Sequence, residues 1–196
     1  MNVVIIRYRA GNIQSVLFAL QRLGITPVLS SDPEVIAKAD KVIFPGVGEA
    51  SGTMQELKAS GLDRTIKGLK QPFLGICLGL QLMCKHSEEG NVDCLGIFDL
   101  NVRKFNSENK ELKVPHVGWN NIQNLEGPLF KGITENSYVY YVHSYYAETG
   151  NETRATTNYI LPFSASLAKD NFYAVQFHPE KSGTVGETIL KNFIEL

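Results

Sequence analysis

One cysteine of the chain stands where it could act as a nucleophile. The segment Gly75-Ile76-Cys77-Leu78-Gly79 has the form of a nucleophile elbow, G-x-S-x-G, with cysteine in place of serine. Small neighbours allow a sharp turn from a strand into a helix, and the unpaired N–H groups at the start of that helix favour a thiolate. A lone cysteine is more often a packing residue. A window of this form, however, is expected by chance far less than once in a chain of this composition.

A cysteine nucleophile needs a general base, and the base needs a group that orients its ring. His178-Pro179-Glu180 follows the apolar run 172–177, which places the histidine at a strand end with a carboxylate close behind it. Glu180 can accept a hydrogen bond from the imidazole and stabilise its protonated form. Such a tripeptide alone is more often a turn, but together with the elbow it predicts a catalytic triad of Cys77, His178 and Glu180. The other histidines, His86, His116 and His143, lack this pattern. His143 lies within an aromatic run, where it is expected to pack in the interior or to line a site.

A glycine-containing loop follows the apolar run 41–44. Its sequence, Pro45-Gly46-Val47-Gly48-Glu49-Ala50-Ser51, invites comparison with a dinucleotide-binding loop. The match fails because Ser51 stands where G-x-G-x-x-G needs its third glycine, and because Glu49 would repel a phosphate. Small residues here could instead present backbone N–H groups to an oxyanion that develops beside Cys77. A plain turn is the alternative.

The elements that must position these residues follow an alternating pattern. Short apolar runs alternate with amphipathic segments in the first half, as expected of strands joined by crossover helices over a parallel sheet, and the second half is richer in β-type segments. We therefore predict one α/β domain over residues 1–196, a flavodoxin-like three-layer fold whose mostly parallel sheet is extended by antiparallel strands. Strands are expected at 3–6, 26–29, 41–44, 73–76, 138–146, 154–157 and 172–177. Helices are expected at 13–23, from 33, at 51–59 and 62–69, from 78 to about 86, and at 184–196.

The bulk composition narrows the classes of function. With 196 residues, 43% of them hydrophobic, the chain is long enough for one globular domain with a core. A formal net charge of −1 favours a small-molecule or protein partner over nucleic acid or an anionic membrane. The cysteines form no C-x-x-C pair, which argues against disulfides and zinc and for a reducing compartment, the cytoplasm. Cys84 and Cys94 are expected to be inert packing residues. No apolar run has the length of a signal peptide or a membrane span.

Three motifs resemble, in order and spacing, the class I (triad) glutamine amidotransferases: the Pro-Gly-Val-Gly loop, the elbow with Gln81, and His-Pro-Glu. More narrowly, four segments are similar to the glutaminase subunits of imidazole glycerol phosphate synthase. These are Pro-Gly-Val-Gly, Pro115-His116-Val117-Gly118-Trp119-Asn120, Val142-His143-Ser144-Tyr145 and His178-Pro179-Glu180-Lys181-Ser182. The resemblance covers essentially the whole chain. One departure is the segment 7–12, where many relatives have an acidic residue and a glycine-rich turn; Arg7 and Arg9 there could alter the face toward a partner.

The resemblance implies hydrolysis of L-glutamine to glutamate and ammonia through a thioester on Cys77, without a metal or an organic cofactor. It also implies a heterodimer with a (β/α)₈-barrel cyclase subunit, to which the ammonia passes in histidine biosynthesis. By position it assigns the oxyanion site to Val47 and Leu78. It places glutamine against Gly48, Gln81, Glu89, Ser144 and Tyr145, and the cyclase against Asn12, Trp119, Tyr140 and Lys181.

Two alternatives remain open. The same chemistry could serve another acceptor, as in the glutaminases of pyridoxal phosphate synthase and anthranilate synthase. Those families typically have Gly-Gly-Glu-Ser and Pro-Gly-Pro-Gly, respectively, where this chain has Pro-Gly-Val-Gly. The chain could also be a catalytically silent, flavodoxin-like binding module that keeps the elbow only as architecture.

Overall fold

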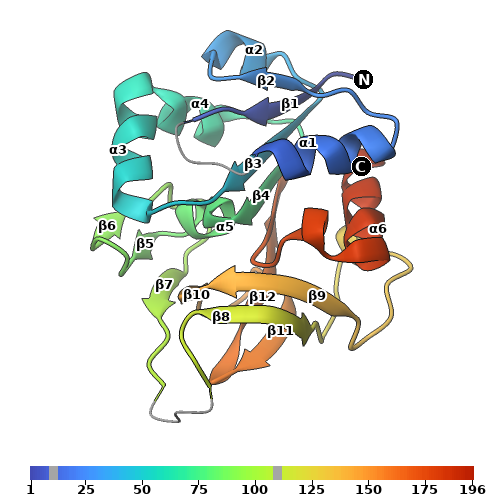
Figure 1. Cartoon of the computed structure of the whole chain (residues 1–196). Helices are drawn as coiled ribbons and strands as arrows, with labels where there is room; N and C mark the ends of the chain where they lie inside the picture. Colours follow the sequence, from blue (N-terminus) through green and yellow to red (C-terminus); the bar gives the residue numbers. More distant parts are fainter. Residues whose placement is uncertain (9–12, 108–111) are drawn as a thin grey trace.

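The computed structural model describes residues 1–8, 13–107 and 112–196. The largest sheet in these residues contains β1 Val3–Ile6, β2 Val28–Ser30, β3 Lys41–Gly46, β4 Phe73–Cys77, β11 Thr153–Tyr159, β12 Leu161–Lys169 and β13 Phe172–Val175. The strands lie in the order β11-β12-β13-β4-β3-β1-β2 (Figure 1). Pairing is parallel from β13 to β2 and antiparallel from β11 to β13. The carboxyl ends of β3, β4 and β13 therefore meet at one edge, where α/β sheets place their sites.

Helices cover both faces of this sheet (Figure 1). They are α1 Ile13–Arg22, α2 Pro33–Ala37, α3 Ala50–Ser60, α4 Leu62–Gly68, α5 Leu78–Met83 and α6 Gly183–Ile194. In β1, Val4 and Ile6 pack with residues of α2, α3, α4 and α5, whereas Val3 and Ile5 pack with residues of α1 and α6. Side chains alternate across a strand, so a strand that is apolar at every position has to be buried on both faces.

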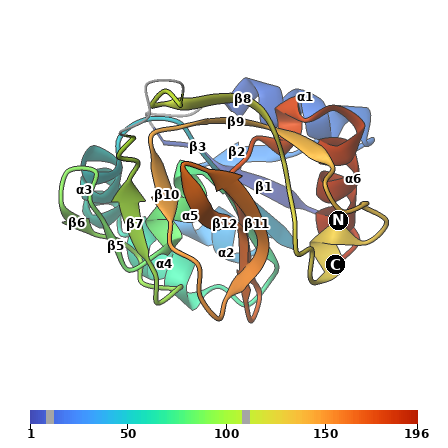
Figure 2. The same cartoon turned by 90° about the horizontal axis from the view of Figure 1, so that it is seen from below.

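Two smaller sheets complete the described structure. A four-stranded sheet, in the order β10-β7-β5-β6, contains β5 His86–Ser87, β6 Val92–Asp93, β7 Asn101–Lys104 and β10 Tyr145–Ala147. An antiparallel ribbon contains β8 His116–Asn121 and β9 Tyr138–His143, which lie side by side in Figure 2. Short 3₁₀ helices occur at Pro128–Phe130 (η1) and Pro179–Lys181 (η2). In the described parts of the chain no helix has both the length and the apolar character needed to cross a membrane.

The predicted α/β class, with a mostly parallel sheet extended by antiparallel strands, is confirmed. The prediction of a helix from 78 to about 86 is wrong at its end, because α5 stops at Met83. The loop 95–97, which comes after β6, donates N–H groups to the carbonyls at the end of this helix: Leu95 to Leu82 at 2.8 Å, Gly96 to Cys84 at 2.8 Å and Ile97 to Met83 at 2.9 Å. These tertiary hydrogen bonds satisfy the carbonyls that a further helical turn would have used.

Two of the expected strands are shorter in the structure. The segment 138–146 is interrupted at Ser144, so that β9 pairs with β8 whereas β10 pairs with β7. The segment 172–177 forms a strand only as far as Val175. Gln176 still donates its N–H to the carbonyl of Ala165 in β12 at 2.9 Å, and the N–H of His178 donates to the carbonyl of Tyr140 in β9 at 2.9 Å. This hydrogen bond ties the segment that contains His178 to the ribbon.

Candidate active site

Cys77 is the last residue of β4 and immediately precedes α5. Its backbone has φ 54° and ψ −108°, a strained conformation for a residue with a side chain. The flanking glycines permit this turn. A Cβ at Gly79 would strike the carbonyl oxygen of Phe44, and a Cβ at Gly75 would strike the sulfur of Met83. The structure therefore contains the strand, sharp turn and helix that the elbow pattern predicts.

Gly79→Ala is expected to destabilise the fold by about 1–3 kcal/mol, because the added methyl group overpacks against rigid backbone. Gly68→Ala, in α4, is the matched control, since a Cβ there meets nothing within 4 Å. Urea unfolding of both variants measures the difference in the free energy of unfolding. Equal stability of the two variants would contradict the steric role assigned to Gly79.

His178 and Glu180 form a buried pair. Each side chain is 2% exposed, and Nδ1 of His178 lies 2.8 Å from Oε1 of Glu180. With Nδ1 as the donor in this pair, Nε2 is the ring nitrogen left to exchange a proton. Among the described residues Nε2 has no hydrogen-bond partner, and neither has Oε2 of Glu180. Buried polar atoms without partners are uncommon, and Nε2 belongs to a residue that lines the pocket described below, so it is available to a bound molecule.

Burial disfavours the protonated form of His178, but Cys77 and Glu180 outweigh this effect and raise the pKa of His178 to about 10. Because Nε2 has no partner at hydrogen-bond length, we attribute the influence of Cys77 to the charge of its thiolate rather than to a hydrogen bond. Catalytic hydrogen bonds are often long without substrate and shorten when it binds. At neutral pH, imidazolium is therefore the favoured form of His178 whenever Cys77 is ionised.

A pocket of about 340 Å³ is lined by Cys77 and His178. Its volume lies in the range of small-ligand sites. The residues expected to bind glutamine or the oxyanion all line it: Val47, Gly48, Leu78, Gln81, Glu89, Ser144 and Tyr145. The lining also includes Pro115 and Val142, two apolar residues to which the sequence patterns assign no role in the site. The fold thus brings together segments that are far apart in the sequence.

The loop between β3 and α3 meets the elbow at the carboxyl edge of the sheet. In the parallel register Gly46 pairs with Cys77 at the ends of β3 and β4, so Val47 and Leu78 directly follow two paired residues of adjacent strands. The approach is close, since a Cβ at Gly46 would lie 2.6 Å from the Cβ of Leu78. The register therefore brings the two residues expected at the oxyanion site to the same part of the pocket.

Carboxylates occupy the N-terminus of α3. Glu49 accepts hydrogen bonds from the N–H groups of Ser51 and Gly52, both at 2.8 Å, and Glu89 accepts one from Ala50 at 2.9 Å. A phosphate would need these same N–H groups, so the geometry supports the exclusion of a dinucleotide.

Burial raises the pKa of Glu89. The hydrogen bond from Ala50 opposes this rise, and the charge of Glu49 adds to it.

One buried glutamine side chain lies beside the sulfur of Cys77, and a second one is hydrogen-bonded to the first. Nε2 of Gln176 is 3.7 Å from Sγ, and Oε1 of Gln176 accepts a hydrogen bond from Nε2 of Gln81 at 3.0 Å. Gln81 also donates to the carbonyl of Tyr145 at 2.9 Å. The sequence patterns do not single out Gln176. Its one trace in the sequence is a polar residue within the apolar run 172–177, which requires polar partners in the interior.

Two further histidines pack behind these groups. Nδ1 of His116 lies 3.0 Å from Nε2 of His143, and Nδ1 of His143 lies 2.7 Å from the carbonyl oxygen of Tyr145. The ring of His116 stacks on those of Tyr141 and Tyr159, with centroids 4.8 and 3.9 Å away. Burial lowers the pKa of His116 to about 4 and that of His143 to about 3, so both rings are neutral at pH 7. His143 both packs in the interior and lines the pocket.

The other two cysteines are buried free thiols, as expected of packing residues. Burial is the main cause that raises the pKa of Cys84 well above its ordinary value and that of Cys94 to about 12. A thiol that ionises only at high pH is a poor nucleophile. Of the three cysteines, Cys77 alone has the strained turn, the helix N-terminus and the adjacent pocket that catalysis requires.

Three residues expected to face a partner form a group on β8, β9 and η2. Trp119 is 55% exposed, and its ring centroid lies 6.0 Å from that of Tyr140. Nζ of Lys181 lies 6.0 Å from the centroid of the same Tyr140 ring. The predictions for Asn12 and Arg9 fall outside the described residues.

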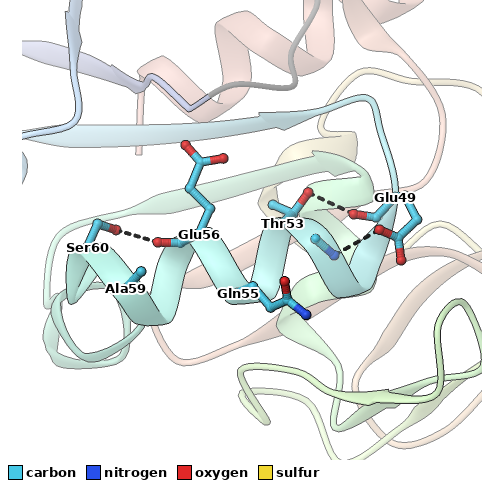
Figure 3. A pocket seen from close by; sticks show the side chains of 7 residues that line it. Glu49, Thr53, Gln55, Glu56, Ala59 and Ser60 are labelled. Atoms are coloured by element: carbon cyan, nitrogen blue, oxygen red, sulfur yellow. Dashed lines mark hydrogen bonds between the residues drawn. The ribbon is translucent and has the colours of Figure 1, made fainter.

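A larger hollow, of about 830 Å³, runs along α3 (Figure 3). It is lined by Glu49, Gly52, Thr53, Gln55, Glu56, Ala59 and Ser60. Figure 3 shows hydroxyl groups bonded to the helix itself: Thr53 donates to the carbonyl of Glu49 and Ser60 to that of Glu56. The lining residues include no thiol, imidazole or cation. Despite its smaller size, the pocket at Cys77 is therefore the better candidate for catalysis.

Comparison with known proteins agrees with the chemistry of this pocket. Residues 6–196 match the family described as Glutamine amidotransferase class-I. The imidazole glycerol phosphate synthase subunit HisH of Bacteroides fragilis (strain YCH46) is 63% identical over 196 residues, and the alignment covers 100% of both chains. The protein of that name from Yersinia pseudotuberculosis serotype I is 47% identical over 198 residues, again with 100% of both chains covered.

A solved structure supports the fold. The crystal structure of a glutamine amidotransferase from Thermotoga maritima has a TM-score of 0.63 at 19% identity, over 100% of this chain and 81% of that one. At this identity the likeness shows the fold alone, whereas the family follows from the sequence matches. The chain belongs to the class-I glutamine amidotransferase family and, within it, to the family of the imidazole glycerol phosphate synthase subunit HisH.

Proposed function

We propose that this chain is the glutaminase subunit of an imidazole glycerol phosphate synthase, which hydrolyses L-glutamine to glutamate and ammonia for histidine biosynthesis. The family to which it belongs supports this assignment. The strongest structural support is one pocket lined by a thiol at a strained turn and by the histidine of a buried histidine–carboxylate pair. We further propose that residues 1–196 act as one catalytic domain in the cytoplasm, without a metal or an organic cofactor.

In the proposed reaction the thiolate of Cys77 attacks the side-chain amide carbon of glutamine, which forms a C–S bond and a tetrahedral oxyanion. His178, as imidazolium, gives a proton to the amide nitrogen, the C–N bond breaks, and ammonia leaves a thioester behind. The neutral imidazole then takes a proton from water, whose oxygen attacks the thioester and releases glutamate and the thiolate. Glu180 keeps the ring oriented throughout. The raised pKa of His178 supports its role as the acid of the first half-reaction.

The N–H groups of Val47 and Leu78 are the proposed donors to the oxyanion. Leu78 begins α5, and the first N–H groups of a helix have no partner within it. Val47 follows Gly46, which pairs with Cys77 in the parallel register. A preorganised donor of this kind contributes about 10²–10³-fold to kcat, because it is aimed at charge that develops only in the transition state.

The amino-acid end of glutamine is proposed to bind Gly48, Gln81, Glu89, Ser144 and Tyr145. Glu89 offers a carboxylate at the pocket wall, which suits the ammonium group of the substrate. Gln81 can offer only its amide oxygen, because both hydrogens of Nε2 are used by the carbonyl of Tyr145 and by Gln176. An acceptor likewise suits an ammonium group rather than a carboxylate.

We propose that Trp119, Tyr140 and Lys181, together with Asn12, contact a (β/α)₈-barrel cyclase subunit in a heterodimer. The relatives are named as subunits of a synthase, which supports a second subunit. Exposed aromatic side chains are typical of protein interfaces. The same ribbon supplies Val142 to the pocket lining, so a partner bound here would stand at the pocket and could receive ammonia before it escapes to solvent.

Trp119→Ala is expected to weaken binding of the cyclase subunit by at least about 30-fold, the loss typical of an aromatic residue central to an interface. Titration calorimetry with the purified cyclase measures the Kd. Val28→Ala serves for comparison, because Val28 is 45% exposed on the edge strand β2, outside the proposed interface, and should not change the Kd. Unchanged affinity in Trp119→Ala would contradict the proposed interface. A barrel partner other than the histidine cyclase would overturn the choice of acceptor.

A further inference from the structure

Gln176 places a hydrogen-bond donor beside the nucleophile. It directly follows β13, it is fully buried, and its Nε2 lies 3.7 Å from Sγ of Cys77. Its backbone N–H donates to the carbonyl of Ala165 at 2.9 Å, which fixes the main chain at this position. A buried amide needs partners for both its oxygen and its NH₂ group, so which end faces the sulfur is not arbitrary.

A backbone carbonyl determines the orientation of this amide. The carbonyl oxygen of Tyr145 can only accept, so Gln81, 2.9 Å away, has to turn its NH₂ group toward it. The other hydrogen of that NH₂ group needs an acceptor, which is Oε1 of Gln176 at 3.0 Å. The NH₂ group of Gln176 is then the end that faces Cys77. The reverse orientation would set two NH₂ groups against each other.

A second donor holds the carbonyl of Tyr145 in place. The ring of His143 is neutral, because burial lowers its pKa to about 3, and its single hydrogen lies on Nδ1, which donates to this carbonyl at 2.7 Å. Nε2 of His143 is therefore an acceptor, and it meets Nδ1 of His116 at 3.0 Å. The two rings, the carbonyl and the two amides form one hydrogen-bonded chain with a single consistent set of donors, and this chain ends at the sulfur of Cys77.

We infer that Gln176 is a positioning residue that presents an N–H group to the sulfur of Cys77 and favours the thiolate over the thiol, with its orientation fixed by Gln81 and the carbonyl of Tyr145. The inference rests on the proposed function, because it states how that nucleophile is kept reactive. An N–H donor stabilises a neighbouring anion, and the effect is larger where water is excluded. A role in packing alone would require no donor at this position.

Other titratable groups also surround the sulfur. They are His178 with Glu180 behind it, His143 from β9, Glu89 at the pocket wall, and Tyr8 after β1, whose pKa is raised by burial and by the charge of Cys77. None of these groups is itself changed by a substitution at position 176. A difference in pH profile between variants at position 176 therefore reports the amide.

The test is the pH dependence of Cys77 alkylation by iodoacetamide in the full chain, followed by mass spectrometry of the Cys77 peptide. Gln176→Glu replaces the donor with a carboxylate oxygen, so the pH of half-maximal alkylation rate should rise by at least about one unit. At a pH below both midpoints, alkylation should then be slower by about 10-fold or more. Gln176→Met has a similar volume but no donor and no charge, so the pH of half-maximal alkylation should rise by a smaller amount. This variant also tests the inference if Gln176→Glu does not fold.

Ser166→Ala controls for disturbance of the buried sheet. Its hydroxyl donates to the carbonyl of Ala174 at 2.8 Å and takes no part in the hydrogen-bonded chain that ends at Cys77, so the pH of half-maximal alkylation should not move. Identical midpoints in the wild type and both Gln176 variants, or an equal shift in Ser166→Ala, would overturn the inference. Iodoacetamide needs no bound glutamine. Failure of the proposed function, seen as glutamine hydrolysis by Cys77→Ala, is therefore distinguishable from failure of this inference.

Discussion

Cys77→Ala is expected to lower the rate of glutamine hydrolysis by at least about 10⁴-fold. The thiolate forms the covalent bond on which both half-reactions depend, and the pocket geometry places this one sulfur beside His178. A coupled dehydrogenase assay for glutamate measures the rate. Synthesis from added ammonium salt by the complex with the cyclase should persist, because that reaction bypasses the thioester.

Cys94→Ala is the comparison for this variant. The Cys94 sulfur is buried and donates to the carbonyl of Val92 at 3.6 Å, outside the lining of the pocket, so activity should stay near that of the wild type. Hydrolysis at the wild-type rate by Cys77→Ala would show that this thiol is not the nucleophile. Loss of ammonium-dependent synthesis together with hydrolysis would show damage to the fold or the interface rather than to the chemistry.

Glu180→Gln is expected to lower kcat by about 10³-fold at pH 7. The carboxylate lies 2.8 Å from Nδ1 of His178, and both side chains are 2% exposed, so water screens its charge little. The amide keeps the shape but loses the charge that stabilises the imidazolium, and it can present a donor where the ring needs an acceptor. Steady-state kinetics with glutamine measure kcat, and a kcat within about tenfold of the wild type would contradict the orienting role.

The same substitution should have a pH-dependent effect on stability. The pKa of His178 is raised from 6.5 to about 10 in the folded chain. The stabilisation from this shift is therefore fully present below about pH 6.5 and is lost as the pH rises through about 10. The difference in the free energy of unfolding between the wild type and Glu180→Gln should shrink as the pH is raised from 7 to 10. Glu195→Gln, at an exposed carboxylate, should show no such trend.

The parallel half of the fold could be predicted because its strands are buried on both faces. β1, β3 and β4 are apolar at nearly every position, a pattern that a half-exposed strand does not show. β12 has no counterpart among the expected strands, because its centre consists of the small residues Ser164, Ala165 and Ser166. Its place in the sheet depends on pairing with β11 and β13, which no local pattern reveals.

Candidate catalytic residues could be identified from the sequence because they lie within short motifs. The glycines that permit the turn lie two positions before and after Cys77, and Glu180 lies two positions after His178. Gln176 could not be found in this way, since its partners Cys77 and Gln81 are 99 and 95 positions away. The end of α5 cannot be predicted from local sequence for the same reason, because the N–H groups that replace its last turn come from the loop 95–97. Hydrogen-bond partners that are this far apart in the sequence can be identified only once the arrangement of the strands is known.

Covalent labelling by a diazo-ketone analogue of glutamine tests most directly whether Cys77 is the nucleophile of a glutaminase. The thiolate displaces nitrogen from the protonated diazo-ketone and forms a stable thioether, and mass spectrometry of the digested protein identifies the labelled residue. We expect one label per chain, on Cys77, and we expect excess glutamine to suppress it. Preferential labelling of Cys84 or Cys94, or labelling of Cys77 that glutamine does not suppress, would contradict a glutamine-specific thiol at this site.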